Sequence, residues 1–148
     1  MTLENLLRIS RLQQFVASAD GVQRMLDSAA RNLNDARLAG LSSDNRFDAA
    51  YKAIMQCAMV GLWANGYRTS TNQPGHHQTA LQALPLTLGL PADSVIIFDA
   101  LRKQRNINDY EGDPVTGAAA DECIHQAEHL LTHTRQWLKQ HKPELLNP

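Results

Sequence analysis

A chain of 148 residues has the usual size of one domain and can bury a core without a disulfide or a metal. Its 14 Lys and Arg against 15 Asp and Glu leave a formal net charge of −1, which excludes a broad basic field able to hold long nucleic acid by charge alone. An aromatic content of 5%, with alanine and leucine abundant, favours helices over sheets.

The cysteines and the N-terminal residues indicate a cellular location. Cys57 and Cys123 are far apart, are flanked by apolar residues and form no CxxC pair, which predicts two reduced, packed thiols. The first residues lack the basic stretch and apolar run of a signal peptide. No apolar run is long enough to span a membrane. We therefore expect a cytoplasmic protein with no membrane segment.

The first third of the chain predicts three helices. Apolar residues recur at three- and four-residue spacings over residues 3–16 and again over residues 22–36, and Asp20-Gly21 is expected to break or bend the chain between these helices. Residues 42–44 then offer N-caps for a third helix that continues to about Trp63. Because its apolar residues wrap most of the way round, this helix should be the central and most buried one.

Residues 67–75 have no periodicity and are rich in turn formers, so we expect a loop there. A short fourth helix is predicted over residues 76–84, and Pro91 suits the first turn of a fifth helix. After a Gly-Asp-Pro turn, Thr116 can cap a final helix that runs to about His141. The prediction is an all-α, antiparallel helical bundle of four to five long helices and a short one, forming a single domain over residues 1–148.

Polar and charged residues gather at the end of the predicted fifth helix. At about 100° per residue, Arg105 and Asn108 fall within about 40° of the apolar stripe centred on Leu101. Polar groups on an apolar face must find partners, because an unpaired buried charge is costly. Arg105 therefore either closes the last helix carbonyls with its long side chain or belongs to a functional site.

Two parts of the chain resemble segments of a known family: residues 48–54 followed by residues 64–69, and residues 101–106 followed by Tyr110. The first part is similar to the long central helix and exit loop of the HEPN (higher eukaryotes and prokaryotes nucleotide-binding) family of helical, RNA-associated proteins. The second part resembles the signature of that family, in which an Arg precedes a polar residue and, four to six positions on, a His. The resemblance covers residues 47–138 and implies the HEPN helical fold.

Within the signature, Arg105 matches the arginine and Asn106 the polar residue, while Arg102 flanks them and Tyr110 stands where the family has His. In nucleolytic members the Arg and His lie near a dimer interface and act on the RNA backbone without a metal. Arginine can stabilise charge on a phosphate, and histidine can move a proton near neutral pH. Tyrosine, whose ordinary pKa is near 10, is a poor base at pH 7. The resemblance therefore implies a phosphate-binding groove but predicts no ordinary HEPN ribonuclease.

The leading hypothesis is a non-catalytic or degenerate, RNA- or nucleotide-associated homodimer of a toxin–antitoxin or defence-type system. It would use Arg102, Arg105 and Asn106 to hold a phosphate or a partner carboxylate, would need no cofactor, and would pair with a nucleotidyltransferase-type protein. The alternative is a metal-independent ribonuclease toxin that relies on Arg105, with Asn106 and Tyr110, or with a histidine such as His77 brought close by folding. A third hypothesis is a plain oligomeric scaffold, in which Arg105 is fully paired and no groove surrounds it.

Three further groups of residues have two interpretations each. The segment from His125 to His129, with His133 beyond, matches the HxxEH pattern of zinc peptidases, but helical geometry turns both histidines about 160° from the buried Ala127. We therefore expect a solvated stripe and no dedicated metal site, with adventitious transition-metal binding as the alternative.

His76 and His77 are expected at a helix start, from which they could reach the groove. Tyr51 and Trp63 either stack on a base or pack in the core.

Overall fold

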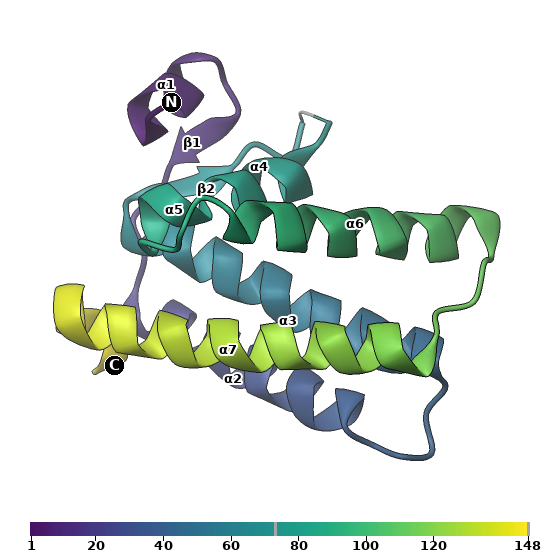
Figure 1. Ribbon diagram of the computed structural model, residues 1–148. Helices are drawn as coiled ribbons and strands as arrows, with labels where there is room; N and C mark the ends of the chain where they lie inside the picture. The colour runs from purple at the N-terminus through teal and green to yellow at the C-terminus, as the bar shows by residue number, and fades with distance from the viewer. Residues whose placement is uncertain (73, 148) are drawn as a thin grey trace.

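The computed structural model describes residues 1–72 and 74–147. Seven α-helices, two short strands and a final 3₁₀ turn follow one another within these ranges (Figure 1). In chain order they are α1 (Leu3–Arg8), β1 (Leu12–Gln14), α2 (Ala19–Ala36), α3 (Ser43–Ala64), β2 (Tyr67–Thr69), α4 (His76–Gln82), α5 (Leu84–Thr87), α6 (Ser94–Glu111), α7 (Gly117–His141) and η1 (Pro143–Leu146).

The central position of α3 organises the molecule. Twelve of its residues are buried, and they lie on all sides of the helix. Helices α2 and α7 pack along α3, while α6 lies beside it over a shorter stretch (Figure 1). This arrangement confirms the predicted all-α helical bundle and the central place of its third helix. Within the described residues, no helix is both long enough and apolar enough to cross a membrane.

Helices α3 and α7 begin where the sequence predicts. The hydroxyl of Ser42 accepts a hydrogen bond from the backbone N–H of Asn45 at 3.1 Å and caps α3. The hydroxyl of Thr116 caps α7 in the same way through Ala119. Gly112 ends α6 with a φ of 75°, a left-handed conformation that favours glycine.

The prediction of a first helix over residues 3–16 is wrong in its second half. Helix α1 ends at Arg8, and Ser10 takes a left-handed φ of 64° that turns the chain into β1. Strand β1 pairs antiparallel with β2, with Leu12 opposite Thr69, so the predicted loop also contains a strand. Local periodicity could not reveal this ribbon, because its two strands lie more than fifty residues apart and only their pairing stabilises them.

Two helix boundaries also differ from the prediction. Asp20-Gly21 lies in the first turn of α2 and does not break the chain, because the Ser18 hydroxyl accepts a hydrogen bond from the Gly21 N–H at 3.0 Å. The predicted fourth helix divides into α4 and α5, with Pro85 in the first turn of α5. Helix α6 begins at Ser94, three residues after Pro91.

Both cysteines are free and buried, as the sequence predicts. Burial raises the pKa of the Cys57 thiol and of the Cys123 thiol to about 12 each. Both thiols therefore stay protonated at neutral pH, and they belong to the packed interior.

The contact between α3 and α5 leaves no room for a side chain at Gly61. A Cβ atom there would lie 2.9 Å from Thr87 Oγ1 and 3.0 Å from Leu88 Cγ. Overpacking costs about 1–3 kcal/mol, more than the gain of about 1 kcal/mol from replacing a helical glycine by alanine. We therefore expect Gly61→Ala to lower the free energy of unfolding by about 1 kcal/mol in urea denaturation. A Cβ at Gly40 meets nothing within 4 Å, so Gly40→Ala is the matched control and should not destabilise the protein.

Candidate functional site

Arg105 turns from α6 toward α3 and stacks on an aromatic ring. Its Cζ atom lies 5.6 Å from the centroid of the Tyr51 ring, a cation–π distance. Its Nε atom lies 2.8 Å from Oδ2 of Asp109, one turn further along α6. This Nε is buried, and its N–H does not point well enough at the carboxylate to count as a hydrogen bond. Tyr51 and Asp109 thus hold the guanidinium from two sides.

His77 completes the group from a third helix, α4. Its Nδ1 atom lies 3.4 Å from the Tyr51 hydroxyl oxygen, a long and weak hydrogen bond. Tyr51, His77 and Arg105 therefore converge from α3, α4 and α6, although 54 positions separate the first from the last. The three side chains line a cavity of about 480 Å³, here called the Arg105 cavity, together with Met25, Asp48, Lys52, Met55, Gln56 and Met59.

Burial controls the protonation of the two groups beside Arg105. It raises the pKa of Tyr51 to about 12, although the positive charges of Arg105 and Arg102 act in the opposite direction. Burial also lowers the pKa of His77, and the positive charges of His76, Arg105 and Arg102 lower it further. At pH 7 the cavity therefore presents a protonated phenol and a neutral imidazole beside the cation.

Arg102, which the sequence placed in the site, is engaged elsewhere. Its Nε donates to Oδ1 of Asp99 at 2.9 Å, and Nζ of Lys103 lies 3.3 Å from the other oxygen of the same carboxylate. Burial acts to raise the pKa of Asp99, but the hydrogen bonds from Arg102 and Lys103 outweigh it and hold that pKa below its ordinary value. Arg102 contributes charge near the site and does not line the Arg105 cavity.

The remaining signature positions do not meet Arg105 in the cavity. Tyr110 is 81% exposed and Asn106 is half-buried, and neither lines it. Five residues on a helix correspond to a rotation of about 140°, which turns Tyr110 away from Arg105. Asn108, predicted close to the apolar stripe, donates from Nδ2 to the backbone oxygen of Asp113 at 2.9 Å and secures the turn after α6.

Arg105 lines an open cavity, and within the described residues its ion pair is with Asp109. Its role in a functional site stays a prediction. His77 had two interpretations, a histidine at a helix start or one that reaches the groove, and it lies at the start of α4 and lines the cavity. The ring of Tyr51 is buried in the core, while its hydroxyl faces His77.

His125 and His129 of α7 point to solvent, as helical geometry predicts, whereas His133, the third histidine of the predicted stripe, is half-buried. His125 and His129 are exposed, with ring centroids 4.4 Å apart. The glutamate between them, Glu128, pairs with Nη2 of Arg37 on α2 at 3.2 Å. Nε2 of His133 lies 2.6 Å from the backbone oxygen of Leu88 and ties α7 to the segment after α5. Over residues 1–72 and 74–147, no group of three or more His, Cys, Asp or Glu side chains is arranged to hold a metal ion.

Comparisons of the chain with family models, with curated proteins and with solved structures give no match.

The positive charge of Arg105 should have a measurable effect on the pKa of His77. Because Arg105 is one of the cations that lower the pKa of His77, Arg105→Gln should raise that pKa toward its ordinary value, while the contribution of burial remains. The measurement is an NMR titration of the His77 imidazole. Lys139→Gln, which removes a cation on α7, is the control and should leave the pKa of His77 unchanged. A fall in that pKa after Arg105→Gln would contradict the geometry of the cavity.

Proposed function

We propose that the chain is a HEPN-like helical protein that binds a phosphate-bearing ligand, RNA or a nucleotide, in the Arg105 cavity without cleaving it. The sequence resemblance suggests the family, and one structural observation carries the proposal. The guanidinium of Arg105 lies at an open cavity, held in place by Tyr51 and Asp109. Such a component of a toxin–antitoxin or defence-type system would act in the cytoplasm.

The orientation of Arg105 supports phosphate binding. A guanidinium has five N–H donors, and Asp109 approaches only at Nε. Among the described residues, no other ion pair of Arg105 occurs, so its two terminal nitrogens remain available to a ligand. Two parallel hydrogen bonds from these nitrogens suit the oxygens of a phosphate. Because Tyr51 and Asp109 already order the side chain, little conformational entropy is lost on binding.

The proton-transfer groups favour binding over cleavage. Tyr110, at the position of the family histidine, lies on the exposed face of α6. Tyr51 touches the cavity, but with a pKa raised to about 12 it keeps its proton at pH 7 and cannot act as a base. The signature positions therefore supply a cation for the phosphate and no base to accompany it.

One observation favours a second function, a metal-independent ribonuclease. His77 lines the same cavity as Arg105, and its lowered pKa leaves the imidazole neutral and able to accept a proton at pH 7. In this reaction His77 would take the proton of a ribose 2′-hydroxyl, whose oxygen would attack the adjacent phosphorus to form a 2′,3′-cyclic phosphate. The 5′-oxygen of the next nucleotide would be displaced and would leave as a hydroxyl after taking a proton from water. Arg105 would stabilise the charge on the phosphate oxygens.

Binding and cleavage of the same RNA separate the two functions. We expect wild type to bind single-stranded RNA in the presence of EDTA and to leave its length unchanged. A hydrogen bond to a charged group is worth about 1.5–3 kcal/mol, so Arg105→Ala should weaken binding about tenfold or more in fluorescence anisotropy.

Arg31 provides the control variant, and His77 provides the variant that tests cleavage. Arg31→Ala, at an exposed position on α2, should bind as wild type does. Shortening of the RNA by wild type that both Arg105→Ala and His77→Ala abolish would establish the ribonuclease. Equal binding by Arg105→Ala and wild type would refute both functions and favour the scaffold.

The outer face of α6 supports the proposed homodimer. Ile96, Ala100, Lys103, Ile107 and Tyr110 follow one another at spacings of four and three residues, and all five are exposed. Alternating spacings of this kind form the seam of paired helices. The buried side chains of α6, Phe98 and Leu101, lie on its opposite side. A second copy packed antiparallel on this stripe would cover it and would bring the start of each α6 against the end of the other.

Charge at the seam tests the dimer. Ile107→Glu places a carboxylate in this outer stripe of α6, where pairing would bury it twice, once in each protomer. We expect light scattering after size-exclusion chromatography to give a dimer for wild type and a monomer for this variant. Leu38→Glu changes an exposed leucine outside α6 and should remain a dimer. A monomeric wild type would contradict this part of the proposal.

The nucleotidyltransferase-type partner stays a prediction of the sequence resemblance.

A further inference from the structure

A second aromatic group lies at the other end of α3 from Tyr51. The rings of Phe15 and Trp63 have centroids 5.4 Å apart, and Cζ of Arg68 lies 5.4 Å from the centroid of Phe15. The planes of the two rings are tilted by 45°. The β1–β2 ribbon positions this group. Arg68 donates from Nε to Oε1 of Gln13, its partner in the ladder, at 3.1 Å, and Phe15 N–H donates to the backbone oxygen of Gly66 at 2.9 Å. The two tilted rings and the guanidinium are thus held in place before any ligand arrives.

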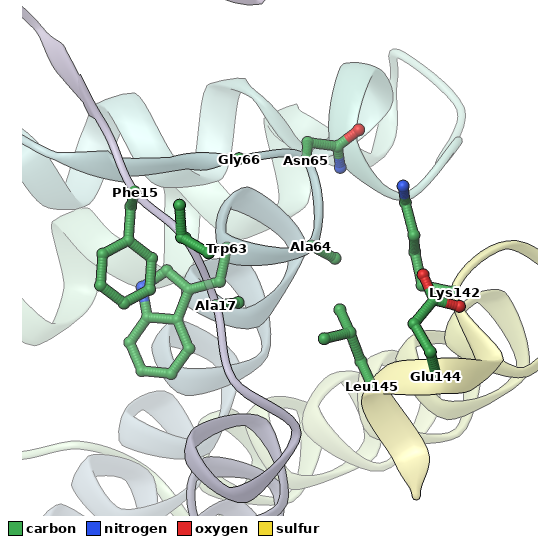
Figure 2. Close-up of a pocket in the computed structure, with 10 residues that line it drawn as sticks. Phe15, Ala17, Trp63, Ala64, Asn65, Gly66, Lys142, Glu144 and Leu145 are labelled. Atoms are coloured by element: carbon green, nitrogen blue, oxygen red, sulfur yellow. The ribbon is translucent and has the colours of Figure 1, made fainter.

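The aromatic pair forms a wall of two cavities. One, of about 390 Å³, extends from the two rings to Lys142 and Glu144, which lie on its opposite side (Figure 2). The other, of about 280 Å³, contains Arg68 and reaches along α3 to Met59. Trp63 is only partly buried although it belongs to the central helix. Aromatic surface next to open space and beside a cation can accept a flat, polarisable ring.

Met59 joins this region to the Arg105 cavity. It lines both the cavity that contains Arg68 and the one that contains Arg105, so the two cavities are neighbours along α3, and together they are here called the α3 groove. From Tyr51 to Trp63 the helix advances twelve residues, or about 18 Å. Stacked nucleotides of one strand rise 3.4 Å each in a duplex, so only a strand of several nucleotides reaches both ends.

Charge along the α3 groove is opposite in sign to that of the whole chain. Among its lining residues, Lys52, Arg68 and Arg105 are cations and Asp48 is the one carboxylate; with Asp109, which pairs with Arg105, the balance is +1 from three against two. The complete chain has a formal net charge of −1. The groove therefore combines local positive charge with aromatic faces, the two features by which proteins bind single strands without reading their sequence.

We propose that a single-stranded RNA lies along the α3 groove, with a phosphate at Arg105 and an unpaired base stacked against Trp63 and Phe15. This inference rests on the proposed function and adds a base-binding site to it. Arg68 serves this site by stacking on Phe15 and by meeting the backbone of the strand. The methionines in the floor of the groove would equally accept the apolar side chains of a protein helix. A guanidinium stacked on an aromatic pair favours the nucleic acid.

The chain holds only two tryptophans, which makes the site directly observable. In Trp137→Phe, emission comes from Trp63 alone, and titration with a ten-nucleotide single-stranded RNA should quench it saturably as a base stacks on the indole. In Trp63→Phe, emission comes from Trp137, whose ring stacks on His141 of α7 at 4.5 Å. This second emission should not change. Uridine monophosphate, which cannot span the groove, should quench Trp63 far less than the strand does at equal concentration.

Variants provide an independent readout. Stacking of one base contributes about 1–3 kcal/mol, so Trp63→Ala should raise the Kd for the RNA about five- to 150-fold, provided that its circular dichroism matches wild type. Arg68→Gln changes an exposed residue and carries little risk to folding. It should weaken binding and reduce the dependence of log K on log salt by about one phosphate contact. Trp137→Ala is the matched control and should bind as wild type does.

The outcomes distinguish this inference from the function on which it rests. RNA binding that needs Arg105, with Trp63 emission unchanged and Trp63→Ala and Arg68→Gln binding as wild type, would overturn the base-binding site alone. The proposed function would survive, and the methionine floor would then be available to a protein helix. Failure of wild type to bind either the RNA or uridine monophosphate would overturn both.

Discussion

The burial of α3 is the constraint on which the rest of the structure depends. Its apolar residues surround the helix, so every side of it must be covered or must line a depression. Helices α2 and α7 cover most of it, and α5 packs closely at Gly61. Helix α6 contributes only Phe98 and Leu101 as buried side chains. The uncovered strip of α3 between α2 and α6 becomes the floor of the groove.

Because α3 is incompletely covered, polar and charged side chains meet at the edge of the groove. Tyr51 can bury its ring in the core while its hydroxyl reaches the opening, because the strip lies at the boundary of the interior. Arg105 reaches across the gap from α6 and lies over that ring. Partial burial then keeps Tyr51 protonated and His77 neutral, so a cation stands beside two uncharged polar groups. Such a site is suited to an anion that brings its own hydrogen-bond acceptors.

The sequence predicted what depends on local spacing and failed where distant segments meet. The caps at Ser42 and Thr116, the central helix and the inward face of Arg105 all follow from helical periodicity. The β1–β2 ribbon did not follow from local spacing, because each strand has only three residues and forms by pairing with the other. The alignment with a family signature assigned Tyr110 to the site, whereas a rotation of about 140° from Arg105 places it on the outer face. His77 was named as a candidate, but only tertiary packing puts it beside Tyr51.

The most direct test of the account follows the side chains of the cavity while RNA is added. In an NMR titration with a short single-stranded RNA, the account predicts that signals of the Tyr51 ring, the His77 imidazole and the Arg105 guanidinium shift together and saturate at one common Kd. Signals of His125 and His129 on the solvent face of α7 should stay in place. Shifts confined to α7, or none at the three cavity residues while RNA binds elsewhere, would contradict the claim that this cavity is the ligand site.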